Sequence, residues 1–108
     1  MNRLKIEKEL LEGAIVREPV GDEKGYWVGA PGWCWDDTDQ AAYLTYRIRR
    51  PRGVEPDRGG ESRIARTTDF QTFEDVWSVL KSQYHSASIE KSILRRGQDG
   101  QWRYFTSY

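Results

Sequence analysis

The sequence has very few of the residues that build disulfide scaffolds and metal centres. Its 108 residues include one cysteine, Cys34, and one histidine, His85. A lone cysteine forms no internal disulfide, and a structural zinc site takes about four cysteine or histidine ligands. Disulfide-stapled scaffolds and zinc modules are therefore excluded, and we expect no metal and no cofactor.

Net charge and long apolar runs are also missing. The 17 basic residues balance 17 acidic residues, and the mean hydropathy is -0.84. A balanced chain creates no long-range field toward nucleic acid or an anionic membrane, and a transmembrane helix needs about 20 consecutive apolar residues. Residues 1–9 contain no apolar run typical of a signal peptide. We expect no nucleic-acid partner, no membrane partner and a cytoplasmic location.

Aromatic residues are plentiful. They make up 13% of the chain, as five Trp, six Tyr and three Phe. Flat rings pack well on a pleated surface, so this composition favours strands. Burial in a core is the first role to expect for large aromatic side chains, and stacking on a ligand is the alternative.

The clearest predicted strand covers residues 42–50. Tyr, Thr and Arg occupy its odd-numbered positions, and Leu, Tyr and Ile occupy its even-numbered positions from 44 to 48. This period of two is that of a β-strand. Residues 3–12 fit a short helix. Further strands are expected near residues 33–35, 62–67, 73–80, 88–96 and 102–108, although residues 74–82 also fit one or two helical turns.

Turn-forming residues separate these strands. Pro31-Gly32 is expected to interrupt the chain before Trp33, and residues 51–61, with two Pro and three Gly, are expected to form a loop outside any sheet interior. The aspartates at positions 36, 37 and 39 are expected to form a turn, with a cation or substrate site as the alternative. Asp99-Gly100 favours a hairpin before the last strand.

A strand, an Asp-containing turn and an aromatic strand occur twice, ending on Tyr43-Leu44-Thr45-Tyr46 and on Tyr104 to Tyr108. Five segments in this order resemble the opening of five-bladed β-propeller glycoside hydrolases of families 43 and 32. They are residues 30–37, 43–47, 64–74, 88–90 and 100–104. The resemblance covers about residues 26–108.

The resemblance implies an all-β fold, a partial five-bladed β-propeller. Residues 26–81 would form one antiparallel four-stranded blade, residues 88–108 would supply the first hairpin of a second blade, and residues 1–25 would be an N-terminal arm. The chain would then be a fragment of a longer propeller protein. Such a partial ring leaves strand edges unpaired, so we expect self-association or poor solubility.

The resemblance also implies carbohydrate chemistry. In this family, carboxylates on the first three blades flank one glycosidic bond. Glu90 stands where the family has its second acidic group and is the candidate catalytic residue. The family's first acidic group precedes a proline, but here Ala30 precedes Pro31. The carboxylate set is therefore incomplete, and we expect a glycoside-hydrolase-like fragment that acts on or binds carbohydrate and is inactive alone.

Two other functions stay open at this point. One is a non-catalytic carbohydrate-binding or assembly module, and the other is a small enzyme that pairs His85 with Glu90. The candidate substrate-binding residues are Trp33, Arg49 and His85. Trp33 shares a strand face with Trp35 and would pack between blades or stack on sugar. Arg49 is one of seven arginines between positions 47 and 66 and could hold a polar group bidentately.

Overall fold

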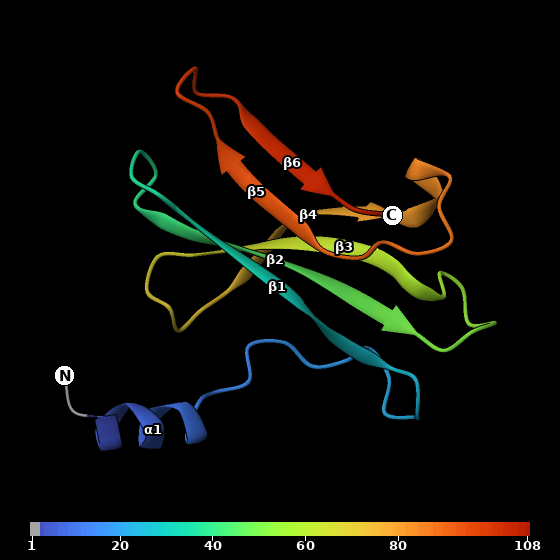
Figure 1. The fold of residues 1–108 in the computed structure, drawn as a ribbon, viewed down its shortest axis with the longest axis horizontal. Coiled ribbons are helices and arrows are strands. Elements are labelled where there is room, and N and C mark those ends of the chain that lie inside the picture. The colour runs from blue at the N-terminus through green and yellow to red at the C-terminus, as the bar shows by residue number, and fades with distance from the viewer. Residues whose placement is uncertain (1–2) are drawn as a thin grey trace.

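A computed structural model describes residues 3–108, and in them six strands form two antiparallel sheets (Figure 1). The elements are α1 (Arg3–Leu11), β1 (Trp27–Asp36), β2 (Ala41–Arg50), β3 (Arg58–Thr67), β4 (Glu74–Leu80), the 3₁₀ helix η1 (Lys81–Tyr84), β5 (Ser92–Arg96) and β6 (Trp102–Thr106). Sheet A has the order β1-β2-β3-β4, and sheet B is the β5–β6 hairpin. The predicted antiparallel, mostly β fold is confirmed. Residues 1–2 of the predicted arm lie outside the described residues.

The β1–β2 hairpin closes through the predicted aspartate turn. The Asp36 carboxylate accepts a hydrogen bond from the Asp39 backbone N–H at 2.8 Å, and the Gln40 side chain donates to the Asp37 carbonyl at 2.7 Å. Side-chain bonds of this kind are the reason aspartate favours turns. The described residues contain no group of three or more His, Cys, Asp or Glu that could hold a metal ion.

Strand β1 continues through Pro31-Gly32, where the sequence predicted a break. Two residues, Ala30 and Pro31, stand between the register positions of Gly29 and Gly32, and this is a β-bulge. Ala30 has a φ of 50°, in the left-handed region. Strand β1 lies at an edge of sheet A, so proline can be accommodated there without leaving a central ladder bond unmade.

Strand β3 begins at Arg58, so the prediction of a loop through residue 61 is wrong for its last four residues. Gly59 and Gly60 lie buried inside sheet A. A Cβ atom on Gly59 would lie 2.1 Å from the Ile89 carbonyl oxygen, and one on Gly60 would lie 2.1 Å from the Pro56 carbonyl oxygen. Both glycines are therefore required by close backbone approach, whereas in the sequence they read as loop residues.

Sheet B covers part of one face of sheet A, which we call the hairpin face. The Thr45 hydroxyl donates to the Ser92 carbonyl at 2.8 Å, and the Ile89 backbone N–H donates to the Gly59 carbonyl at 2.7 Å. Strand β5 thereby packs against β1 and β2. The last residues of the chain lie beside η1 (Figure 1), and Tyr108 stacks on Tyr84 there.

The opposite face of sheet A, which we call the arm face, carries the main hydrophobic core. Leu44, Tyr46, Ile48 and Ala65 form this core, and Val16, Val28 and Phe73 pack against it. The N-terminal arm thus contributes a core side chain although it forms no strand. Helix α1 precedes this contact, and no helix of residues 3–108 is long and apolar enough to cross a bilayer.

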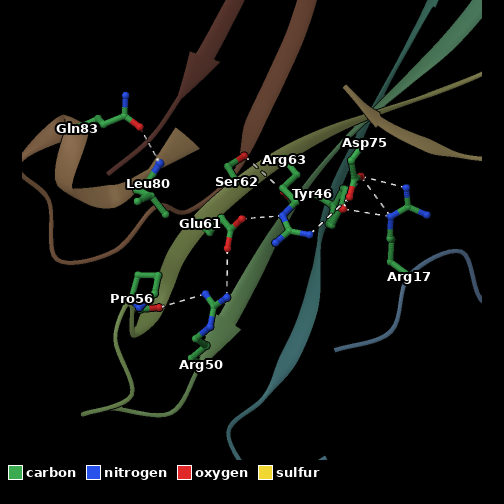
Figure 2. A network of polar contacts seen from close by, with 10 residues as sticks. All are labelled: Arg17, Tyr46, Arg50, Pro56, Glu61, Ser62, Arg63, Asp75, Leu80 and Gln83. Atoms are coloured by element: carbon green, nitrogen blue, oxygen red, sulfur yellow. Dashed lines mark hydrogen bonds and ion pairs between the residues drawn. The ribbon is translucent and has the colours of Figure 1, made fainter. Parts of the chain in front are cut away.

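A polar network fixes the arm to the sheet (Figure 2). Arg17 donates to the Asp75 carboxylate at 3.0 Å and to the Tyr46 hydroxyl at 3.1 Å, while Tyr46 donates to Asp75 at 2.6 Å. Burial, together with the hydrogen bond to Asp75, raises the pKa of Tyr46. Arg63 extends the network from Asp75 to Glu61, and Arg50 completes it. These groups satisfy one another and hold the fold together.

Candidate functional site

The bulge in β1 separates the predicted substrate-binding residues onto two faces of sheet A. Trp33 pairs in register with Leu44, so it lies on the arm face. Trp27 pairs with Arg49, so both lie on the hairpin face. Glu90 joins them there through Arg47. The structure therefore links Arg49 to Glu90 through Trp27 and Arg47 on the hairpin face, and it leaves Trp33 on the other face of the sheet.

We call Trp27, Arg47, Arg49 and Glu90 the Glu90 cluster. Arg47 donates to the Glu90 carboxylate at 2.6 Å and to the Ile89 carbonyl at 2.9 Å. The guanidinium carbons of Arg47 and Arg49 lie 4.8 and 5.2 Å from the centroid of the Trp27 ring. Such cation–π contacts restrain a long side chain in one position. The cluster lies where β1 begins and β2 ends.

The Glu90 cluster, as the described residues form it, contains one carboxylate. Glycosidases place two carboxyl groups about 5–9.5 Å apart across the bond they cleave. In the described residues the partner of the Glu90 carboxylate is the Arg47 guanidinium. One carboxylate and two guanidiniums offer hydrogen-bond donors, an acceptor and charge to a polar ligand.

Sequence reasoning missed Trp27 and Arg47. Arg47 is two residues from Arg49, so the alternation of β2 was a signal that both guanidiniums share a face. The position of Trp27 had no such local signal, because it depends on the register of β1 against β2 beyond the bulge.

His85 lies at the end of η1, apart from the Glu90 cluster in its contacts. Its φ of 52° is left-handed, and its backbone N–H donates to the Ser82 carbonyl at 3.1 Å. The side chain is exposed. No hydrogen bond or ion pair joins His85 to Glu90 within residues 3–108, so the enzyme in which these two residues act as a pair gains no support from the contacts.

An ion pair connects the loop between β2 and β3 to η1, at the end of sheet A where β2 ends. Lys81 forms an ion pair with Asp57 and also donates to the Asp57 backbone carbonyl at 3.1 Å. The Gly53 backbone N–H donates to the Asp57 carboxylate at 3.0 Å. The hydrogen bond from Lys81, and then that from Gly53, lowers the pKa of Asp57 to about 2. The ion pair between Lys81 and Asp57 therefore connects η1 to this loop.

Replacing Asp57 with asparagine should make stability less sensitive to acid. The folded pKa of Asp57, about 2, lies below its ordinary value of 3.8. A carboxyl with a depressed folded pKa stabilises the fold above its unfolded pKa, and this contribution is lost as the pH falls toward 2. Asparagine does not titrate. Urea unfolding at stepped pH should show a smaller loss from pH ~4 to pH ~2 in the variant than in the parent chain.

Asp22 provides the matched control, because it is exposed and forms no ion pair or hydrogen bond in the described part of the chain. Asp22→Asn should keep the acid dependence of the parent chain. If Asp57→Asn lost as much stability as the parent chain between pH ~4 and pH ~2, the ion pair with Lys81 would contribute nothing to the fold.

A second surface lies on the arm face, and we call Trp33, Trp35 and Phe70 the aromatic platform. The Trp33 and Trp35 side chains are 48% and 49% exposed, and Phe70 is 55% exposed. The Phe70 ring is 6.3 Å from that of Trp35 at an interplanar angle of 12°, and 6.2 Å from that of Trp33. The prediction that Trp33 and Trp35 share a face is confirmed by this common neighbour.

Each ring of the platform has contacts that position it. Trp33 meets Phe73 edge-on at 6.0 Å, and Phe73 packs on the core. The Trp35 indole N–H donates to the Asp37 carboxylate at 2.9 Å. The Phe70 backbone N–H donates to the Thr67 hydroxyl at 2.9 Å and fixes the turn that carries the ring. A hollow of about 520 Å³ lies next to the platform, between residues 14–17 and 70–73.

An apolar cleft of about 390 Å³ lies between the two sheets on the hairpin face. Its lining residues are Tyr43, Ile64, Val76, Trp77, Leu94, Trp102 and Tyr104. Sheet B is two strands wide and sheet A is four, so the cleft opens above β3 and β4. Ring contacts of 4.7 Å between Tyr43 and Trp102 and of 5.0 Å between Trp77 and Tyr104 cross it. The side chains themselves partly fill this space.

The geometry thus offers two surfaces with different chemistry, the charged Glu90 cluster and the aromatic platform. They lie on opposite faces of sheet A and share no residue. Comparison of the chain with protein-family models, with curated proteins and with solved structures finds no match.

Proposed function

We propose that this chain binds carbohydrate without hydrolysing it, and that sugar stacks on the aromatic platform. The observation that carries this proposal is the exposure of three fixed aromatic rings, each about half open to solvent, on one face of β1 and the adjoining turn. A contiguous exposed apolar patch on a small protein marks a surface that is covered by a partner or ligand. A sugar ring has an apolar C–H face and a polar rim, which match a flat ring edged by polar groups.

The expected affinity follows from the area that a sugar would cover. Removing about 200 Å² of apolar surface from water contributes about 5 kcal/mol. This is an upper limit, because the lost freedom of the ligand offsets part of it. The dissociation constant for one sugar is therefore expected to be about a millimolar or weaker, and tighter for an oligosaccharide that spans all three rings. Weak binding of this kind suits a module that holds a polymer at many points.

We also propose the finer architecture, a sector of a five-bladed propeller. Two features support it. The four strands of sheet A follow one another in chain order, and β5 packs against β1, as the inner strands of consecutive blades do around an axis. Arg95 of β5 donates to the Trp33 carbonyl of β1 at 3.3 Å. In a complete second blade, two further strands would lie above β3 and β4, over the inter-sheet cleft.

Hydrolysis by an assembled propeller is the second candidate function. It is favoured by one observation, the bond between Arg47 and Glu90, which brings the segment before β5 to the end of sheet A where β1 begins. In a closed ring this end would be the mouth of the central cavity, and Glu90 would supply one carboxylate of the set that catalysis needs. A closed ring would also cover the arm face and with it the platform. Platform binding is therefore proposed for this chain as an open sector, and hydrolysis for a ring that further blades close.

Variants of the platform and of Glu90 distinguish these functions. Affinity electrophoresis through a panel of soluble neutral polysaccharides should show retardation of the parent chain and at least a ~10-fold weaker interaction for Trp33→Ala. Phe105→Ala is the matched control, since Phe105 is 58% exposed but lies on sheet B. It should bind as the parent does, and Glu90→Gln should also bind normally.

Failure of every polysaccharide to retard the parent chain, or equal retardation of Trp33→Ala and the parent, would refute platform binding. Turnover of a glycoside by the parent chain that Glu90→Gln abolishes would establish the hydrolytic function instead.

A further inference from the structure

We propose that the Glu90 cluster is a second, separate binding site, and that its ligand is the carboxylate of an acidic sugar, a uronate, held by Arg49. The site shares no residue with the aromatic platform and differs from it in chemistry. Binding at this site can therefore be tested separately from binding at the platform.

Arg49 is the unpaired cation of β2. Its neighbours in the strand both have carboxylate partners: Arg47 bonds to Glu90 at 2.6 Å, and Arg50 bonds to Glu61 at 3.2 Å. The Arg49 side chain forms no hydrogen bond and no ion pair in residues 3–108, and its guanidinium contacts the ring of Trp27. A guanidinium has five N–H donors in a planar fork that matches the two oxygens of a carboxylate. The donors of Arg49 are thus available to a ligand.

The side chain is also held in position before any ligand arrives. Trp27 and Arg49 are register partners on adjacent strands, and the Arg49 guanidinium lies 5.2 Å from the Trp27 ring centroid. Arg47 contacts the same ring at 4.8 Å, so one indole positions both cations. Without these contacts, fixing the Arg49 side chain would reduce the free energy of ligand binding, because a long side chain has many rotamers to lose.

The charge of the cluster selects the kind of anion. Arg47 and Arg49 carry two positive charges, and Glu90 carries one negative charge, which leaves one unit of positive charge for the ligand to neutralise. A monoanion neutralises this charge, whereas a phosphate group, with a charge near -2, would leave a net negative charge beside the exposed Glu90 carboxylate. Glu90 accepts hydrogen bonds, so it favours a ligand with hydroxyl groups beside its negative charge. A sugar carboxylate combines these properties.

The test is an NMR titration of the full chain, following the indole N–H signal of Trp27, with sodium glucuronate, glucose and inorganic phosphate as separate probes. Glucuronate should shift this signal with a millimolar dissociation constant, and glucose at the same concentrations should not. Arg49→Gln should weaken glucuronate binding at least ~10-fold, consistent with the loss of one charge-assisted contact. Added salt should also weaken it.

Arg52→Gln is the matched control, because Arg52 is an exposed arginine of the following loop with no hydrogen bond or ion pair in the described residues. It should bind glucuronate within about twofold of the parent. Trp33→Ala should retain glucuronate binding even where it abolishes binding of neutral polysaccharide, so failure of one site is distinguishable from failure of the other. Glucuronate binding no tighter than that of glucose or phosphate would overturn the proposal, as would equal binding by Arg49→Gln and the parent.

Discussion

Replacing Gly59 with alanine is expected to lower the free energy of unfolding by about 3 kcal/mol. The new Cβ would lie 2.1 Å from the Ile89 carbonyl oxygen and 2.7 Å from the Ser88 hydroxyl oxygen. The segment before β5 would have to move away, and the 2.7 Å hydrogen bond from the Ile89 N–H to the Gly59 carbonyl would be strained or lost. For a chain of this size the melting temperature should fall by about 12–24 °C.

Thermal unfolding followed by circular dichroism measures this effect. Gly29→Ala is the control, because Gly29 is also a strand glycine and a Cβ there would meet only the Trp27 ring at 3.5 Å, an ordinary contact distance. That variant should melt close to the parent chain. If Gly59→Ala also melted within about 2 °C of the parent, the contact of the β5 segment with β3 would not be tight in solution.

Replacing Glu61 with glutamine is expected to have an effect of similar size, about 3–5 kcal/mol. Glu61 is only 8% exposed and accepts hydrogen bonds from Arg50 at 3.2 Å and from Arg63 at 2.6 Å. The hydrogen bond to Glu61 raises the pKa of Arg63. Glutamine would leave the largely buried Arg50 guanidinium without a carboxylate partner, and Arg63 would keep only Asp75 at 3.5 Å. Removing one partner of a buried ion pair in this way leaves a charge uncompensated.

Chemical denaturation gives the unfolding free energy of this variant directly. Glu55→Gln is the matched control, since the Glu55 side chain is 72% exposed and its oxygen lies 3.6 Å from the Lys81 nitrogen. An exposed pair of this kind contributes about 0–1 kcal/mol. Comparable losses in the two variants would mean that the network of Figure 2 is no more important to the fold than a surface ion pair.

Local pattern predicted the antiparallel strands, but it did not predict all of their bounds. Strand β5 begins at Ser92, so the expected strand over residues 88–96 is wrong for residues 88–91. The alternation in residues 42–50 anticipated β2 to within one residue, because one strand face is apolar and the other polar. The Asp-Gly turn anticipated the β5–β6 hairpin, where Gly100 has a φ of 82°. Helix α1 was anticipated as well. These are features in which neighbouring residues determine the structure.

Sequence reasoning did not resolve features that depend on contacts between distant segments. The bulge at Ala30 inverts the alternation of β1, so Trp27 and Trp33 lie on opposite faces although six residues of regular strand would place them on the same one. Gly59 was assigned to a loop because its partner, the Ile89 carbonyl, is far along the chain. For the same reason, Glu90 was predicted as a site residue without its Arg47 partner.

The most direct test of platform binding is an NMR titration of the five tryptophan indole N–H signals with a neutral oligosaccharide. Each candidate surface contains its own tryptophans: Trp33 and Trp35 in the platform, Trp27 in the Glu90 cluster, and Trp77 and Trp102 in the inter-sheet cleft. We predict that the signals of Trp33 and Trp35 shift together in a saturable manner while the other three stay in place. Unchanged signals from Trp33 and Trp35 at saturating sugar, or shifts confined to the other three, would contradict the account.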